Sequence, residues 1–245
     1  MLCGLMRLAI ISDIHGNLEA FQAVRSSIER RDLDAVVCLG DMIGYGPDPE
    51  AVIQGVRDLQ CATVLGNHEA SLLSEKARNW MNFQARENNI RTARFLSEES
   101  MEYCRSLPRS LQIGDAWFVH GYPPDSVFIY LFNQTDRRIE DLFTSSEVLI
   151  YFVGHTHDLR LIWQQDEGIM HGPLFQGTIS LAKQRKYIVN VGSVGQPRDG
   201  DKRAKYIIWD SETRELETLF IAYDNSSTIR KIRELGFPDV YAERL

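Results

Sequence analysis

The sequence has few cysteines, and they do not form the pattern of a disulfide framework or a thiolate metal site. Four cysteines are spread over 245 residues without a C-x-x-C pair. This usage excludes the class of small secreted proteins that depend on disulfides for stability. We therefore expect buried, reduced thiols and a cytoplasmic location.

Long hydrophobic runs and clustered positive charge are also missing. No apolar stretch approaches the ~20 residues of a membrane-spanning helix, and residues 8–11 are too short for the core of a signal peptide. The formal net charge is −7, with 27 Lys and Arg against 34 Asp and Glu, whereas nucleic acids and anionic membranes require clustered Lys and Arg. We expect a small-molecule partner, with no nucleic-acid polymer and no membrane. The oligomeric state stays open, a homodimer included.

The length and composition favour one large α/β domain over residues 1–245. The chain is 44% hydrophobic and 25% charged, which is enough to bury a substantial core. It contains no linker, repeat or low-complexity segment. Met6 directly precedes the first apolar run, so either Met1 or Met6 could be the native start.

Five apolar runs end on residues that can bind a metal ion. Short apolar runs that end at turn residues are typical of buried strands, and open α/β sheets place their chemistry at the carboxyl ends of strands. We therefore expect the side chains after these runs to meet at one edge. The runs are residues 8–12 before Asp13 and His15, 36–40 before Asp41, 62–66 before Asn67 and His68, 116–119 before His120, and 150–154 before His155 and His157.

The rest of the chain predicts two packed sheets with helices outside them. Apolar residues with helical spacing follow Asn17, Asp48 and Ser97, each of which is a candidate N-cap. Residues 69–108 do not show the strand pattern, and we interpret them as a helical insert. Later strands at 159–163, 187–191, 204–209 and 216–222, mostly antiparallel, precede a closing helix at 226–235. The predicted fold class is α/β (α+β), a four-layer αββα sandwich of two mixed β-sheets.

The residue types at the predicted edge suit transition metals. Of the six histidines, only His171 does not follow an apolar run. Carboxylate, amide and imidazole ligands without thiolate suit Mn, Fe, Zn or Ni and disfavour Ca. Two ions that share Asp41 as a bridge could hold a hydroxide for in-line phosphoryl displacement. The candidate ligands, too many for one tetrahedral ion, are Asp13, His15, Asp41, Asn67, His120, His155 and His157.

Each motif alone also has an ordinary structural explanation. A D-x-H pattern such as residues 13–15 occurs freely, and the Gly-Asp pair at 40–41 is weaker still. The motifs at 66–69 and 154–157 are more telling, because buried amides and adjacent imidazoles are costly unless they bind a metal or form hydrogen bonds. Their occurrence together, all after apolar runs, favours a metal site. We interpret His171 as a surface or turn histidine.

Taken together, the motifs resemble the calcineurin-like metallophosphoesterase superfamily. They are D-x-H at 13–15, Gly-Asp at 40–41, Gly-Asn-His-Glu at 66–69, His-Gly at 120–121 and G-H-x-H at 154–157. Residues 13–17, 44–49 and 190–200 resemble the small bacterial phosphodiesterase branch. The resemblance implies the αββα sandwich and His68 as the proton donor. It also implies one metal held by Asp13, His15, Asp41 and His157, and a second by Asp41, Asn67, His120 and His155.

Two departures from the superfamily pattern bear on the substrate. Protein phosphatases and symmetrical diadenosine tetraphosphatases carry an arginine shortly after the Gly-Asp motif, but residues 42–46 contain none. Glu69 is one methylene longer than the aspartate that usually follows Asn-His in the smaller phosphodiesterases. Arg198 is the basic residue that we expect near the site, where it binds substrate together with Asn67. The alternative is that Arg198 pairs with Asp199 or Asp201.

The predicted function is a dinuclear metal-dependent phosphodiesterase acting on a small nucleotide-type phosphodiester or phosphoanhydride. In this prediction Asp41 and His68 are the catalytic residues. A diester carries one charge and two free oxygens, so two metals can neutralise it without an arginine at 42–46, whereas a dianionic monoester normally requires arginine. A phosphoprotein or phosphomonoester phosphatase is the alternative. A non-catalytic binding scaffold of the same fold is the third hypothesis.

Overall fold

Two six-stranded mixed sheets pack face to face in the computed structural model, which describes residues 6–245. The first sheet has the order β3 (Ala62–Thr63), β2 (Ala35–Cys38), β1 (Arg7–Ile11), β11 (Ala204–Asp210), β12 (Glu215–Ile221) and β9 (Gly177–Ser180). The second has the order β4 (Ser110–Ile113), β5 (Ala116–Val119), β6 (Ile150–Val153), β10 (Tyr187–Val191), β7 (Leu159–Gln165) and β8 (Gly168–Pro173). In each sheet three adjacent strands run parallel, β1 to β3 in the first and β5, β6 and β10 in the second.

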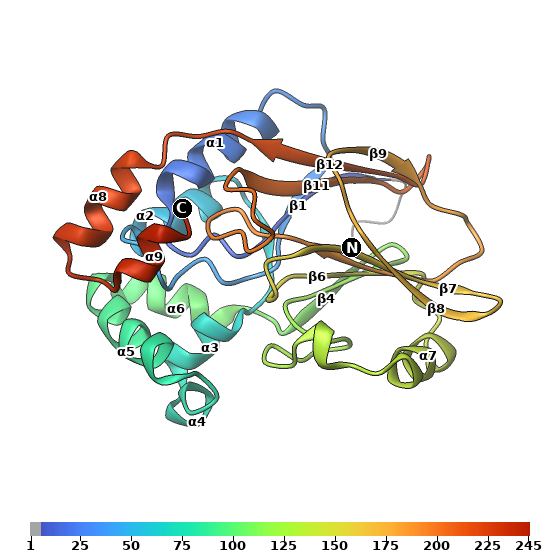
Figure 1. Ribbon diagram of the computed structural model, residues 1–245, viewed down its shortest axis with the longest axis horizontal. Helices are drawn as coiled ribbons and strands as arrows, with labels where there is room; N and C mark the ends of the chain where they lie inside the picture. Colours follow the sequence, from blue (N-terminus) through green and yellow to red (C-terminus); the bar gives the residue numbers. More distant parts are fainter. Residues whose placement is uncertain (1–5) are drawn as a thin grey trace.

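The helices lie outside the two sheets, so that α1 covers the outer face of the first sheet and α7 that of the second (Figure 1). The longer helices are α1 (Leu18–Ile28), α2 (Pro49–Asp58), α5 (Phe83–Thr92), α6 (Glu98–Ser106), α7 (Asp136–Ser145) and α8 (Ser226–Glu234). The shorter ones are α3 (Asn67–Leu73), α4 (Glu75–Arg78) and α9 (Asp239–Glu243), with 3₁₀ turns at Ala93–Phe95 and Leu131–Asn133. This arrangement confirms the predicted four-layer αββα fold.

The alternation of side chains along the strands builds the layers. In β1, Leu8 and Ile10 pack between the two sheets, while Ala9 and Ile11 pack under α1 and α2. A strand buried on both faces reads as a continuous apolar run, as this one does. The core between the second sheet and α7 is separate and includes Ile139 and Phe143.

Most of the predicted boundaries agree with the structure, with some corrections. Asn17 caps α1 by accepting a hydrogen bond from the Ala20 amide at 3.1 Å. Asp48 precedes α2 as predicted but makes no capping hydrogen bond, because its carboxylate binds Lys231 Nζ at 2.8 Å. The sequence interpretation missed α7, β8 and β9; all four residues of β9 are exposed and therefore lack the alternating pattern of a half-buried strand.

Several sequence predictions concern the thiols and the start of the chain. Cys38, Cys61 and Cys104 are free thiols, whereas Cys3 and the choice of Met1 as the start lie outside the described residues. Among residues 6–245, no helix combines the length and the apolar character needed to cross a bilayer.

Candidate metal centre

The loops that follow five strands converge at one edge of the two sheets. Their side chains are buried, although all of them are polar or ionisable. They come from β1 (Asp13, His15), β2 (Asp41), the start of α3 after β3 (Asn67, His68), β5 (His120) and β6 (His155, His157). The structure therefore brings every predicted metal ligand to a single place. His171 lies elsewhere, on β8, where its Nε2 is 2.8 Å from Asp136 Oδ1.

Five of the seven predicted ligands have a left-handed backbone, which is uncommon for residues other than glycine. Hydrogen bonds between loops hold this conformation: the Asp13 amide donates to the Gly40 carbonyl at 3.1 Å and the His15 amide to the Asp41 carbonyl at 3.0 Å. Backbones held in this way cluster at functional sites. The φ angles are 54° at Asp13, 50° at His15, 52° at Asp41, 69° at His155 and 62° at His157.

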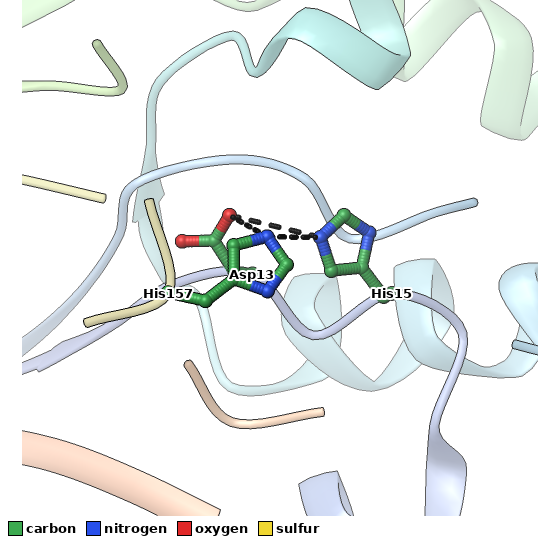
Figure 2. A group of neighbouring side chains, drawn as sticks. All are labelled: Asp13, His15 and His157. Atoms are coloured by element: carbon green, nitrogen blue, oxygen red, sulfur yellow. Dashed lines mark hydrogen bonds and ion pairs between the residues drawn. The ribbon is translucent and has the colours of Figure 1, made fainter. Parts of the chain in front are cut away.

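One group of ligand atoms is formed by Asp13, His15 and His157 (Figure 2). The two Nε2 atoms of the histidines lie 3.1 Å apart. Asp13 Oδ1 lies 3.3 Å from His157 Nε2 and 3.7 Å from His15 Nε2. Burial alone would raise the pKa of Asp13, but His157 and His15 outweigh burial and lower it, so the carboxylate is ionised.

A second group surrounds His120. Its Nε2 lies 2.9 Å from Asn67 Oδ1, 3.2 Å from His155 Nδ1 and 3.2 Å from Asp41 Oδ2. Burial disfavours protonation of His120, but the Asp41 carboxylate outweighs it and raises the pKa of His120 to about 9. Burial lowers the pKa of His155 to about 4. The pocket thus attracts positive charge but does not favour a proton on each imidazole.

Backbone carbonyls fix which ring nitrogen of each histidine carries the proton. A carbonyl only accepts, so the outer nitrogen must donate, and the inner nitrogen of a neutral ring then presents a lone pair. In the first group, two such lone pairs face each other across 3.1 Å when both rings are neutral, an arrangement that a shared cation stabilises. In the second group, His120 Nε2 and His155 Nδ1 lie 3.2 Å apart, and a cation there would replace the proton that Asp41 favours on His120. The outer contacts are His15 Nδ1 to Ile43 O at 2.9 Å, His120 Nδ1 to Leu39 O at 2.8 Å, His157 Nδ1 to Gln196 O at 2.6 Å and His155 Nε2 to Phe128 O at 3.2 Å.

The two aspartates each direct one carboxylate oxygen into these groups. Asp13 Oδ2 accepts hydrogen bonds from the Ser12 hydroxyl at 2.6 Å and the His155 amide at 3.0 Å, whereas Oδ1 has no hydrogen-bond donor among the described residues. Asp41 Oδ1 accepts from the His68 amide at 2.8 Å. Its Oδ2 lies between the two groups, 3.2 Å from His120 Nε2 and 3.8 Å from His15 Nε2. A buried carboxylate oxygen without a donor, such as Asp13 Oδ1, fits a metal ion.

Glu69 connects the two loops that carry Asp41 and Asn67. Its carboxylate accepts backbone hydrogen bonds from Gly66 at 3.2 Å, Asp41 at 2.9 Å, Met42 at 2.8 Å and Ile43 at 3.2 Å. A Cβ at position 66 would lie 2.3 Å from Asp41 Oδ1 and 2.5 Å from Glu69 Oε2, so only glycine fits there. The glutamate that departs from the smaller phosphodiesterases therefore has a defined role, since it positions the loop that carries Asp41.

We expect Glu69→Gln to weaken metal binding by about 10- to 100-fold, because residues that orient metal ligands have effects of this size. The amide would turn an N–H group toward backbone donors that now bind a carboxylate oxygen. A chelator-competition titration measures the affinity. The control is Glu98→Gln, whose side chain is 83% exposed and pairs with Arg105 on the surface. Equal metal affinity in both variants would contradict this role for Glu69.

His68 lies beside the ligands and touches both groups. Its ring centroid is 4.9 Å from that of His15 and 4.7 Å from that of Tyr45, and its ligand atom lies within 4.8 Å of those of His15 and Asp41. Nδ1 has no hydrogen-bond partner among the described residues and faces Gly44, where a Cβ would lie 2.1 Å away. Burial lowers the pKa of His68 to about 3, so its imidazole is neutral at pH 7.

Arg198 lies at the rim of the site. Its guanidinium carbon is 6.0 Å from the ring centroid of Tyr45, and its backbone amide donates to the His157 carbonyl at 3.4 Å. The alternative partners have other ion pairs: Asp199 binds Lys205 Nζ at 2.7 Å, and Asp201 binds Arg203 at 2.6 Å.

Some residues at the site were not found from the sequence. Tyr130 stacks on His155 with a centroid distance of 3.8 Å and an interplanar angle of 17°. The ring centroid of Tyr45 lies 4.6 Å from that of His15. Its position in the Gly-Tyr-Gly motif shortly after Asp41 could have indicated that it lies at the site. The backbone carbonyls that orient the histidines, such as that of Gln196, could not be predicted from the sequence, because every residue type has a backbone carbonyl.

Comparison with known proteins agrees with this geometry. A sequence model of the calcineurin-like phosphoesterase superfamily domain matches residues 6–214. An uncharacterised protein of Methanocaldococcus jannaschii is 32% identical over 243 residues, which cover 97% of this chain and 96% of that protein.

Solved structures show the same fold over nearly all of the chain. The crystal structure of a metallophosphoesterase from Sphaerobacter thermophilus has a TM-score of 0.83 and 31% sequence identity, and the match covers 99% of this chain and 98% of that one. A hypothetical protein from Pyrococcus horikoshii OT3 has a TM-score of 0.76 and 20% identity, with coverages of 97% and 96%. With its buried ligand groups and a family match over most of its length, the chain belongs to the calcineurin-like phosphoesterase superfamily.

Proposed function

We propose that the protein is a dinuclear metal-dependent phosphodiesterase that hydrolyses a small nucleotide-type phosphodiester or phosphoanhydride. The observation that carries this proposal is the position of Asp41 Oδ2 between two groups of buried ligand atoms. One carboxylate oxygen that faces both groups is suited to bridge a pair of ions. The donor set of carboxylate, amide and imidazole groups suits Mn, Fe, Zn or Ni.

The ligand assignment in this proposal follows the two groups. Asp13, His15 and His157 would hold one ion, Asn67, His120 and His155 would hold the other, and Asp41 would be shared by both. When bound, the two ions supply activation of the attacking water and neutralisation of charge on the phosphoryl oxygens. The protein's own contribution is to hold these side chains rigidly and to place a proton donor, His68, beside them.

The surroundings of the metal centre support a diester rather than a monoester. The stretch after Asp41, residues 42–46, contributes the ring of Tyr45 to the site instead of an arginine. Arg198 therefore supplies positive charge from the rim, 6.0 Å from that ring. One guanidinium beside two metal ions suits the single charge of a diester better than the double charge of a monoester.

The test compares a diester with its matched monoester after metal loading. We expect higher kcat/KM for bis(p-nitrophenyl) phosphate than for p-nitrophenyl phosphate, with two equivalents of metal bound. Faster turnover of the monoester and of phosphoserine peptides would instead support a phosphatase. Metal binding without turnover of either ester class would support the binding scaffold.

The free thiols at positions 38, 61 and 104 support a cytoplasmic location as part of this proposal.

Arg198→Ala should raise KM for the diester by about 10-fold, since it removes a charged hydrogen-bond donor for the phosphate. Metal content should stay at the wild-type level, because the Arg198 guanidinium donates to the side chain of Gln196 at 3.4 Å and the contact with the His157 loop is made by the Arg198 backbone amide, which the variant keeps. Steady-state kinetics and elemental analysis measure the two quantities. Arg203→Ala, which removes the ion pair with Asp201, is the matched control. An unchanged KM in Arg198→Ala would show that this arginine does not bind substrate.

A further inference from the structure

A cleft opens directly beside the metal centre. Part of its lining belongs to that centre and consists of Asn67, His68 and His155. The enclosed part of the cleft has a volume of only about 60 Å³, well below the ~300–1,000 Å³ typical of sites that enclose a whole small molecule. A substrate whose phosphoryl group lies at the metal centre would therefore extend along the open mouth of the cleft, over the side chains that line it.

The rest of the lining is rich in aromatic rings, which come from three separate segments, the first being the loop after β2 that carries Tyr45. Trp80 lies between α4 and α5 in the helical insert, while Phe128 and Tyr130 lie on the loop between β5 and α7. The rings of Trp80 and Phe128 are nearly parallel, with an interplanar angle of 18° and centroids 5.8 Å apart. Aromatic faces presented in this way stack with planar rings.

Trp80 keeps much of its surface open to solvent. It is 70% exposed although one part of its ring already stacks on Phe128. A large, rigid aromatic side chain that stays exposed at the mouth of a cleft is available to a ligand at little entropic cost, since only two side-chain torsions need to be fixed.

A polar group accompanies these rings. Asn82 also lines the cleft, and its Oδ1 caps α5 by accepting a hydrogen bond from the Ala85 amide at 2.9 Å. Since the oxygen is used in the cap, the Nδ2 group is the part of the side chain that donates to a ligand. Such a donor suits the carbonyl oxygens and ring nitrogens at the edge of a nucleobase.

We propose that this cleft binds the nucleobase of the substrate, with Trp80 and Phe128 as the stacking surface and Asn82 as a donor to the base edge. The inference rests on the proposed function and deepens it, because it names the residues that would recognise the base of a nucleotide substrate. The base lies in the cleft while the attached phosphate lies at the metal centre.

The test compares two phosphates that differ only in the base. AMP and ribose 5-phosphate are titrated by calorimetry into the metal-loaded protein. Stacking of a base on an aromatic side chain contributes about 10-fold or more to affinity, so AMP should bind at least about 10-fold more tightly. In Trp80→Ala this advantage should fall to near unity, and Trp80→Phe should retain most of it.

The matched control is Phe83→Ala. Phe83 lies in the same insert and is 79% exposed, but it does not line the cleft, so its removal should leave the AMP advantage intact. Equal binding of AMP and ribose 5-phosphate, or an AMP advantage that persists in Trp80→Ala, would overturn the nucleobase site and leave the metal-dependent esterase in place. If neither phosphate bound the metal-loaded protein, the nucleobase site would likewise be overturned, whereas the proposed function fails only if the metal-loaded protein does not hydrolyse bis(p-nitrophenyl) phosphate.

Discussion

Replacing Asp41 by asparagine is expected to abolish turnover, with a loss of about 10³-fold or more in kcat, and to remove metal from the protein. The orientation of the new amide is determined by the backbone. The oxygen must accept from the His68 amide, as Asp41 Oδ1 does at 2.8 Å, so the amide nitrogen replaces Oδ2. That nitrogen carries protons and points at His120 and His15, where it can bind neither ion.

Elemental analysis and steady-state kinetics on the same preparation measure this effect. Asp58→Asn, an exposed carboxylate at the end of α2, controls for the change in net charge. Two equivalents of transition metal and near-normal turnover in Asp41→Asn would refute the dinuclear assignment.

Replacing His68 by alanine should retain the metals and lower the rate by about 10²–10⁴-fold on substrates with a basic leaving oxygen. His68 is neutral in the free protein because burial lowers its pKa to about 3. A general acid must carry its proton when the substrate is bound, so the acid role requires the phosphoryl anion to raise the pKa of His68 in the complex. p-Nitrophenolate needs little protonation, so its release should be much less sensitive to the change.

The measurement pairs a dinucleoside diester with bis(p-nitrophenyl) phosphate in wild-type protein and His68→Ala. His171→Ala, a half-exposed histidine on β8, is the control and should match the wild type on both substrates. Equal losses on both substrates would exclude the acid role. Loss of metal in His68→Ala would make it a ligand, which its distance from His15 and Asp41 also allows.

The sequence predicted which side chains meet because each of them follows an apolar strand. Strands such as β1 and β2 run parallel, so Asp13 and Asp41 had to emerge at the same edge. The predicted sandwich followed from the same strands. The position of Arg198 beside Tyr45, instead of beside Asp199 or Asp201, depends on how the loop after β10 folds, and the residue pattern left both options open.

What could not be predicted depends on backbone atoms and on the packing of distant segments. The four amides that bind Glu69 come from two loops, and backbone groups have no residue signature. Trp80 looked like an ordinary residue of the helical insert, since nothing in its neighbourhood in the sequence places it against Phe128. Asp48 and Pro49 begin α2 as predicted, but the Asp48 carboxylate makes no capping hydrogen bond and instead accepts from Lys231, far along the chain.

Five of the predicted ligands have a left-handed backbone, a conformation that residues other than glycine adopt only at an energetic cost. The residues that the metal site requires are therefore not the ones that the backbone favours. Glycine adopts this conformation without a steric cost, so as far as the backbone conformation alone is concerned, glycine would fit these positions better than the aspartates and histidines that occupy them. Selection for thermal stability alone would therefore favour replacement of these metal ligands. Consensus or stability-guided engineering of this protein should exclude these positions, because a substitution scored as stabilising there would remove a ligand.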